Sequence, residues 1–114
     1  MTEDIKIKAL SGKWSIRAAG AVIAETHGAL ELTEQGYNPV IYFPRDDIAM
    51  AFLDQTDKTS HCPHKGDADY FSIITKNGPI ENVAWSYEAP QEAVAKIKGH
   101  LAFHLNDKIA IEQV

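Results

Sequence analysis

The sequence predicts a mainly β fold, a single antiparallel domain with one short helix near residues 90–98. Three observations lead to this prediction. Apolar and polar residues alternate with period two in many short segments, as in half-buried strands. Gly, Pro and Asn separate these segments and indicate turns. Only one segment carries both start and end signals of a helix. At 114 residues, the chain 1–114 fits one domain with its own core.

The first half of the chain alternates in short pieces. The expected strands are residues 5–8, 14–17, 22–24, 29–32 and 40–43. Residues 18–21 and 36–39 read as turns, and Pro44 should end the fifth strand or leave it at an edge. The apolar run 48–53 suits either a helix or one face of a strand, and we interpret it as a strand.

The second half begins with residues 54–66, which are polar and irregular and predict a surface loop. Further strands are expected at residues 70–75, 83–87, 101–105 and 109–112, with a turn at 76–79. Pro90 suits a first helical turn, Val94 and Ile97 share one helix face, and Gly99 suits the residue after the helix end. One short helix therefore interrupts the β pattern.

Charge and composition exclude several classes of protein. The formal net charge is −5 and the basic residues are scattered, so a sequence-independent grip on nucleic acid is not expected. A single cysteine cannot form an internal disulfide, which favours a reducing cytoplasm. The charged first residues lack a signal peptide's apolar stretch, and no apolar run is long enough to span a membrane.

The segment 59–70 concentrates reactive residue types. Cys62 stands three residues before Lys65, and a nearby cation or imidazole activates a thiol. His61 and His64 are candidate bases for a nucleophilic Cys62. The alternative is that Cys62 is a small buried apolar residue.

Two other segments supply candidate ligand-binding residues. Arg45 with Asp47 would clamp an anionic group, or else form a salt bridge within a turn. Trp85 and Tyr87 share one face of a strand, either as core or, with Tyr70, as pocket walls.

Metal and nucleotide motifs are absent from the sequence. His100 and His104 are four apart in an expected strand, which separates them by roughly 13 Å. Paired Cys or Cys/His knuckles and Gly-rich phosphate loops do not occur. We therefore expect no metal and no cofactor.

Three segments in this order resemble the bacterial family known as domain of unknown function 427: residues 42–48 (YFPRDDI), 59–66 (TSHCPHKG) with Tyr70, and 84–90 (AWSYEAP). The resemblance runs from about residue 18 to the C-terminus. It implies a fold of the beta-tent type, similar to methionine sulfoxide reductase B and the cereblon drug-binding domain. Those relatives often carry zinc on paired cysteines, which this chain lacks. A nucleotidyltransferase label is attached to the family.

The resemblance identifies matching positions in this chain and assigns them no function. The positions that match the family pattern are Arg45, Asp47, Cys62, Lys65, Tyr70, Trp85 and Tyr87. Where the family often has Trp before Glu, this chain has Leu32, Thr33 and Glu34, a difference expected to reshape a pocket wall.

The leading hypothesis is a module that binds a small molecule of anionic or nucleotide-like character. Arg45 and Lys65 would meet its charge, and aromatic residues would wall its pocket. The alternatives are an enzyme, with Cys62 as nucleophile or with nucleotidyl-transfer activity, and a purely structural role of the three segments. The sequence is compatible with a monomer or a homodimer.

Overall fold

The computed structural model describes residues 5–114; residues 1–4, where the charged N-terminal segment begins, lie outside the described part. The strands are β1 (Ile5–Ala9), β2 (Trp14–Ala18), β3 (Ala21–Thr26), β4 (Leu30–Glu34), β5 (Val40–Tyr42), β6 (Leu53–Cys62), β7 (Gly66–Thr75), β8 (Gly78–Tyr87), β9 (Leu101–Phe103) and β10 (Ile109–Gln113). The 3-10 helices of the described residues are η2 (Arg45–Asp47), η3 (Met50–Phe52) and η4 (Glu92–Ile97).

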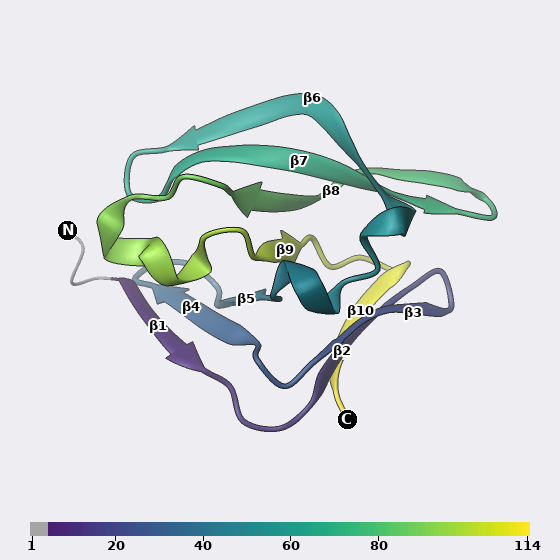
Figure 1. The fold of residues 1–114 in the computed structure, drawn as a ribbon, viewed down its shortest axis with the longest axis horizontal. Coiled ribbons are helices and arrows are strands. Elements are labelled where there is room, and N and C mark those ends of the chain that lie inside the picture. Colours follow the sequence, from purple (N-terminus) through teal and green to yellow (C-terminus); the bar gives the residue numbers. More distant parts are fainter. Residues whose placement is uncertain (1–4) are drawn as a thin grey trace.

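The strands form three antiparallel sheets (Figure 1). The largest has the order β6-β7-β8-β9, and the two smaller sheets have the orders β1-β4-β5 and β10-β2-β3. In Figure 1 the four-stranded sheet lies above the two others, which diverge below it. The mainly β, antiparallel fold class predicted from the sequence is confirmed.

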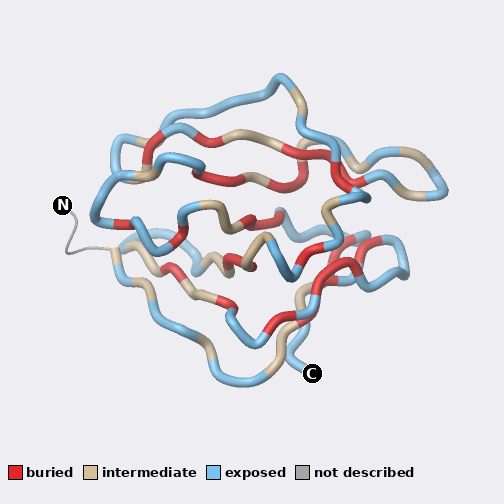
Figure 2. Tube along the Cα trace, viewed as in Figure 1, coloured by how far each residue is buried: buried red, intermediate tan, exposed pale blue. Residues whose placement is uncertain are grey.

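Two apolar cores lie on opposite faces of the four-stranded sheet. One joins Phe71 and Phe103 to the β10-β2-β3 sheet through residues such as Ile16 and Ile109. The other joins the opposite face to the β1-β4-β5 sheet and to η4; its buried members are Leu32, Tyr42, Ala68, Tyr87, Val94, Ile97 and Ala102. Figure 2 shows the buried stretches of β7, β8 and β9 along the chain. The strands β7, β8 and β9 therefore contact an apolar core on each face.

Most predicted strands overlap observed ones, but two predictions are wrong. Residues 48–53 do not form one strand: Ile48 makes an isolated bridge to Ala24, and η3 follows. Residues 54–66 are not a loop, because β6 runs from Leu53 to Cys62 and pairs with β7. β6 is an edge strand whose side chains are mostly exposed, so its sequence is polar. Backbone hydrogen bonds pair it with β7, and such bonds leave no side-chain pattern in the sequence.

The predicted helix is present in a different form. η4 spans Glu92–Ile97 as 3-10 turns, kinked at Val94, where φ is −122°. Val94 and Ile97 are both fully buried, so their shared face is confirmed. Gly99 has φ of +71° just after the helix end, as expected of that position.

A tight turn between β6 and β7 ends at Gly66, which has φ of +116°. The Lys65 amide donates to the Cys62 carbonyl at 3.2 Å, and the Gln91 amide donates to the Lys65 carbonyl at 2.9 Å. A Cβ on Gly66 would lie 3.3 Å from the Ala89 carbonyl oxygen. The turn thus docks closely on the chain that follows β8.

We expect Gly66→Ala to lower the unfolding free energy by about 2 kcal/mol, because the new Cβ adds crowding to an unfavourable positive φ. The matched control is Gly78→Ala, where φ is +104° but a Cβ meets nothing within 4 Å in the described chain. Urea unfolding of both variants measures the difference. Equal losses would show that crowding against Ala89 is unimportant.

Candidate functional site

A cavity of about 530 Å³ opens between the β1-β4-β5 sheet and one face of the four-stranded sheet. Its volume lies in the usual range of small-molecule sites, about 300–1,000 Å³. The turn between β6 and β7 closes one side. The lining residues are Leu32, Glu34, Tyr37, Asn38, Val40, Tyr42, Cys62, Pro63, His64, Lys65, Tyr70, Trp85, Tyr87 and His104.

Six residues predicted from two separate segments meet in this cavity: Cys62, His64, Lys65, Tyr70, Trp85 and Tyr87. β7 and β8 bring the aromatic ones together, since Tyr70 is paired with Trp85 in register. Trp85 and Tyr87 are two apart on β8 and therefore share a face. The predicted shared face of Trp85 and Tyr87 is confirmed.

The aromatic wall is held by contacts with neighbouring side chains. The Tyr70 hydroxyl lies 3.0 Å from Ser60 Oγ, and Lys58 Nζ lies 4.6 Å from the centre of the Tyr70 ring. The Trp85 and His104 rings are tilted at 42° with centroids 4.5 Å apart. Burial and, to a lesser extent, the Lys58 charge lower the pKa of His104, so this imidazole is neutral near pH 7.

A polar cluster lies on the cavity wall beside the aromatic rings. Lys65 Nζ donates to Glu34 Oε1 at 2.8 Å and contacts Cys62 Sγ at 3.5 Å. The side chains of Lys65 and Glu34 are only 13% and 15% exposed, so water screens this pair weakly. Lys65 thus links the turn after β6 to the end of β4.

Burial and charge shift the pKa values of three groups around this cluster. Burial alone would lower the pKa of Lys65, but the hydrogen bond to Glu34 and the neighbouring acidic groups raise it above 10.5. Burial raises the pKa of Tyr42 far above 10.0. Burial also raises the pKa of Tyr87, against the opposing effect of Lys65. At neutral pH the cavity therefore holds one ammonium group and uncharged phenols.

The two histidines beside Cys62 are placed differently. His64 is exposed and lines the cavity. His61 Nδ1 lies 2.7 Å from Asp67 Oδ1, and both side chains are largely exposed. Since alternate residues of β6 point to opposite faces, His61 is not beside the Cys62 thiol.

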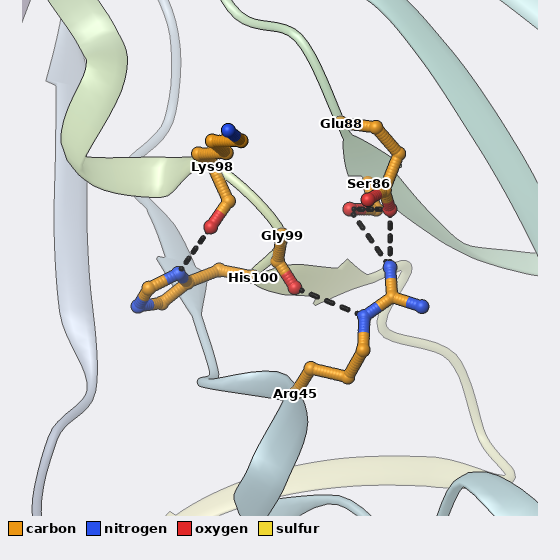
Figure 3. A network of polar contacts seen from close by, with 6 residues as sticks. All are labelled: Arg45, Ser86, Glu88, Lys98, Gly99 and His100. Atoms are coloured by element: carbon orange, nitrogen blue, oxygen red, sulfur yellow. Dashed lines mark hydrogen bonds and ion pairs between the residues drawn. The ribbon is translucent and has the colours of Figure 1, made fainter.

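Arg45 and Asp47 are not brought to the cavity. The Arg45 guanidinium pairs with Glu88, donates to Ser86 Oγ at 3.4 Å and donates to the Gly99 carbonyl at 3.3 Å (Figure 3). It also lies 5.6 Å from the centre of the Phe71 ring. Asp47 accepts a hydrogen bond from the Thr26 hydroxyl at 2.7 Å.

Strand alternation explains this separation. Ser86 lies between Trp85 and Tyr87 on β8 and so points to the opposite face. Phe71 belongs to the core on that face. Because Arg45 contacts Ser86 and Phe71, the sheet itself stands between Arg45 and the cavity.

Eight lining residues were not among the predicted site residues: Leu32, Glu34, Tyr37, Asn38, Val40, Tyr42, Pro63 and His104. For Glu34 the only signal was the departure from the family pattern at residues 32–34, which indicated a pocket wall but assigned Glu34 no role. Tyr42 is the first residue of the YFPRDDI segment, from which only Arg45 and Asp47 were singled out as site residues.

The described residues also give information on metal binding, on a second cavity and on membrane-spanning helices. Within residues 5–114, no group of three or more His, Cys, Asp or Glu side chains is arranged to hold a metal ion. A second cavity, of about 430 Å³, is lined by the tips of the β2–β3 and β7–β8 hairpins and by residues 106–110. It contains none of the residues predicted from the sequence. Among the described residues, no helix is long and apolar enough to cross a membrane.

Comparison with known protein families identifies a match. A family model described as "Domain of unknown function (DUF427)" matches residues 6–114. No curated protein matches the chain significantly.

The Arg45 network predicts a structural effect. We expect Arg45→Ala to lower the unfolding free energy by about 1–2 kcal/mol, since Ser86 and the Gly99 carbonyl lose a donor while the half-exposed Glu88 pair is partly screened. Arg17→Ala is the control, because the Arg17–Glu112 pair is more exposed and 3.7 Å long. Urea unfolding that ranks the two variants equally would contradict a structural role for Arg45.

The raised pKa values predict a loss of stability in alkali. Below about pH 10 the tyrosine phenols are neutral in both the folded and the unfolded protein. Above pH 10 the phenols of the unfolded chain ionise while Tyr42 in the folded protein stays neutral, so the free energy of unfolding falls. Lys65 acts in the same direction, because the unfolded chain releases its proton first. Each group contributes up to about 1.4 kcal/mol per pH unit.

Urea unfolding between pH 8 and 11 measures this slope. Tyr42→Phe should reduce the slope, whereas Tyr37→Phe should leave it unchanged because Tyr37 is 72% exposed. An unaltered slope in Tyr42→Phe would show that the buried phenol is not its source.

Proposed function

Because the chain belongs to the "Domain of unknown function (DUF427)" family, whose description names no activity, we propose a function from its cavity: it binds a small molecule that carries a flat ring. One observation carries the proposal. Residues from β7, β8 and the turn after β6 line a single cavity of about 530 Å³ with aromatic walls and a few polar groups. This is the usual composition of small-molecule sites.

The aromatic walls favour a ring as the main recognised group. Trp85, Tyr70 and Tyr87 offer large, apolar faces from one side of the sheet. Offset or edge-to-face packing on such rings adds about 0.5–1.5 kcal/mol beyond area burial. A nucleobase or another planar ring fits this wall.

The polar cluster binds a polar group at the edge of the ligand ring. Lys65 is held by Glu34 but keeps a donor near Cys62, so it favours an acceptor oxygen on the ligand. A carbonyl, or an anionic group that shares Lys65 with Glu34, meets this requirement. Arg45 takes no part in this version of the site, because it lies across the sheet.

The rival function is an enzyme. The 3.5 Å contact between Lys65 Nζ and Cys62 Sγ inside the cavity favours the version in which Cys62 is a nucleophile. Nucleotidyl transfer and a purely structural role of the segments stay predictions from the sequence. So do the cytoplasmic location and the choice between monomer and homodimer.

Ligand binding is tested by a thermal-shift screen of nucleobases, nucleotides, aromatic carboxylates and aromatic amides. A ligand at one hundred times its Kd adds about 2.7 kcal/mol, which raises the melting temperature by roughly ten degrees in a domain of this size. Trp85→Ala should weaken binding of any hit about tenfold or more, because the ring loses its main packing partner. Arg45→Ala should leave the Kd unchanged.

Fluorescence offers an independent readout. The chain has two tryptophans, and Trp14→Phe leaves Trp85 as the single reporter on the cavity. A hit whose binding changes the Trp85 emission supports the proposal. A hit that binds equally well to Trp85→Ala lies elsewhere and contradicts it.

A further inference from the structure

Cys62, Lys65 and Glu34 form a connected line of reactive groups on the cavity wall. Lys65 Nζ stands between them, 3.5 Å from Cys62 Sγ and 2.8 Å from Glu34 Oε1. Two separate elements bring them together, since Glu34 ends β4 while Cys62 and Lys65 flank the turn after β6. A thiol in contact with a cation, itself oriented by a third group, is an arrangement that activates a nucleophile.

Tyr87 supplies an independent sign that this wall faces a ligand. The residue is only 7% exposed and lines the cavity. Within residues 5–114 its hydroxyl makes no hydrogen bond, although every fully buried polar side-chain atom there has a partner. The hydroxyl therefore opens onto the cavity as a free donor beside the cluster, and its raised pKa keeps it protonated.

We propose that Cys62, Lys65 and Glu34 catalyse acyl transfer to water, by hydrolysing a ring-bearing amide or ester bound in the cavity. This inference rests on the proposed binding function and names its substrate class. Cys62 is the nucleophile and reacts as a thiolate. The Lys65 ammonium stabilises this thiolate and, together with Tyr87, the oxyanion, while Glu34 positions Lys65.

The atoms balance with water as the only co-reactant. The Cys62 thiol gives its proton to water, and the resulting thiolate, held by the Lys65 ammonium, attacks the carbonyl carbon. The tetrahedral oxyanion accepts hydrogen bonds from the Lys65 ammonium and the Tyr87 hydroxyl. Its collapse breaks the carbon–nitrogen or carbon–oxygen bond, and the leaving group takes a proton from water. Water then cleaves the thioester, which releases the acid and restores the thiol.

The surroundings of the cluster suit this chemistry better than a histidine-based mechanism does. Lys65 and Glu34 are 13% and 15% exposed, so their charges act at short range with little screening. His61 is bound to Asp67 on the outside, and His64 is exposed on the turn. Lys65 is the only side chain among the described residues with a hydrogen bond to Cys62 Sγ.

The experiment follows the acylation of Cys62 by 4-nitrophenyl acetate and 4-nitroacetanilide. Rapid quenching and peptide mass mapping give the rate at Cys62, and nitrophenol or nitroaniline release gives turnover. Cys62 is the only cysteine, so a thioester has one possible position. We expect a Cys62 adduct from the ester that turns over in wild type and is absent in Cys62→Ser.

Three variants test the assigned roles. Lys65→Met and Glu34→Gln should each slow Cys62 acylation about a hundredfold, and Tyr87→Phe about tenfold. The double variant Glu34→Gln/Lys65→Met removes both charges together, so it leaves no unpaired buried charge even if a single variant unfolds. Lys8→Met is the control, because Lys8 pairs with Glu31 at 3.7 Å outside the cavity and should leave the rate unchanged.

The outcomes separate this inference from the proposed function. Acylation that is unchanged in the folded double variant overturns the catalytic roles, as does an adduct that water does not release. Ligand binding that persists in Cys62→Ser while wild type shows no acylation overturns catalysis and leaves the binding function intact. Loss of binding in Trp85→Ala together with slowed acylation supports both.

Discussion

The arrangement depends on one constraint: the strands β7, β8 and β9 have an apolar core on each face, so alternate side chains along β7 and β8 point to one core or the other. Tyr70, Trp85 and Tyr87 go to the face that carries the cavity, while Phe71 and Ser86 go to the opposite core or its edge. The pairing of Tyr70 with Trp85 and of Phe71 with Ala84 locks this division. A slip of one residue would exchange the contents of both faces, so the register of this hairpin determines the core and the site together.

The ion pair of Lys65 and Glu34 is the second organising element, and its energetic role differs from that of the cores. Bringing two charges out of water costs several kcal/mol, which their attraction only offsets when the geometry is good. At 2.8 Å the geometry is good, and the pair joins the turn after β6 to the end of β4, on a different sheet. An apolar pair of the same size would hold the sheets together without that cost. Charges retained at such a position, in contact with the chain's one thiol, are better explained by the chemistry of the cavity than by stability.

Sequence reasoning succeeded where the physics is local. Period two placed Trp85 and Tyr87 on one face, and residue spacing placed Val94 and Ile97 together on a short helix. It failed where backbone pairing alone determines the secondary structure. Both faces of β6 are largely exposed, so its sequence is polar and contains no side-chain pattern that indicates its pairing with β7. Arg45 and Glu34 show the same limit for the site. Arg45 has the right chemistry for a ligand clamp but lies across the sheet, whereas Glu34 reaches Lys65 over a separation of 31 residues that no local signal encodes.

The charge balance of the cavity bears on what it accepts. Lys65 already has its counterion in Glu34, His104 is neutral near pH 7, and Tyr42 and Tyr87 stay protonated. A dianionic phosphate would meet one shared ammonium group and would lie close to the Glu34 carboxylate, an arrangement that costs free energy in a poorly screened site. A neutral carbonyl needs only hydrogen-bond donors, and Lys65 and Tyr87 supply two. The aromatic walls then hold the rest of the molecule without any charge. The charge balance that disfavours a phosphate favours an uncharged acyl group beside Cys62. Ligand binding and the proposed hydrolysis therefore select the same kind of molecule.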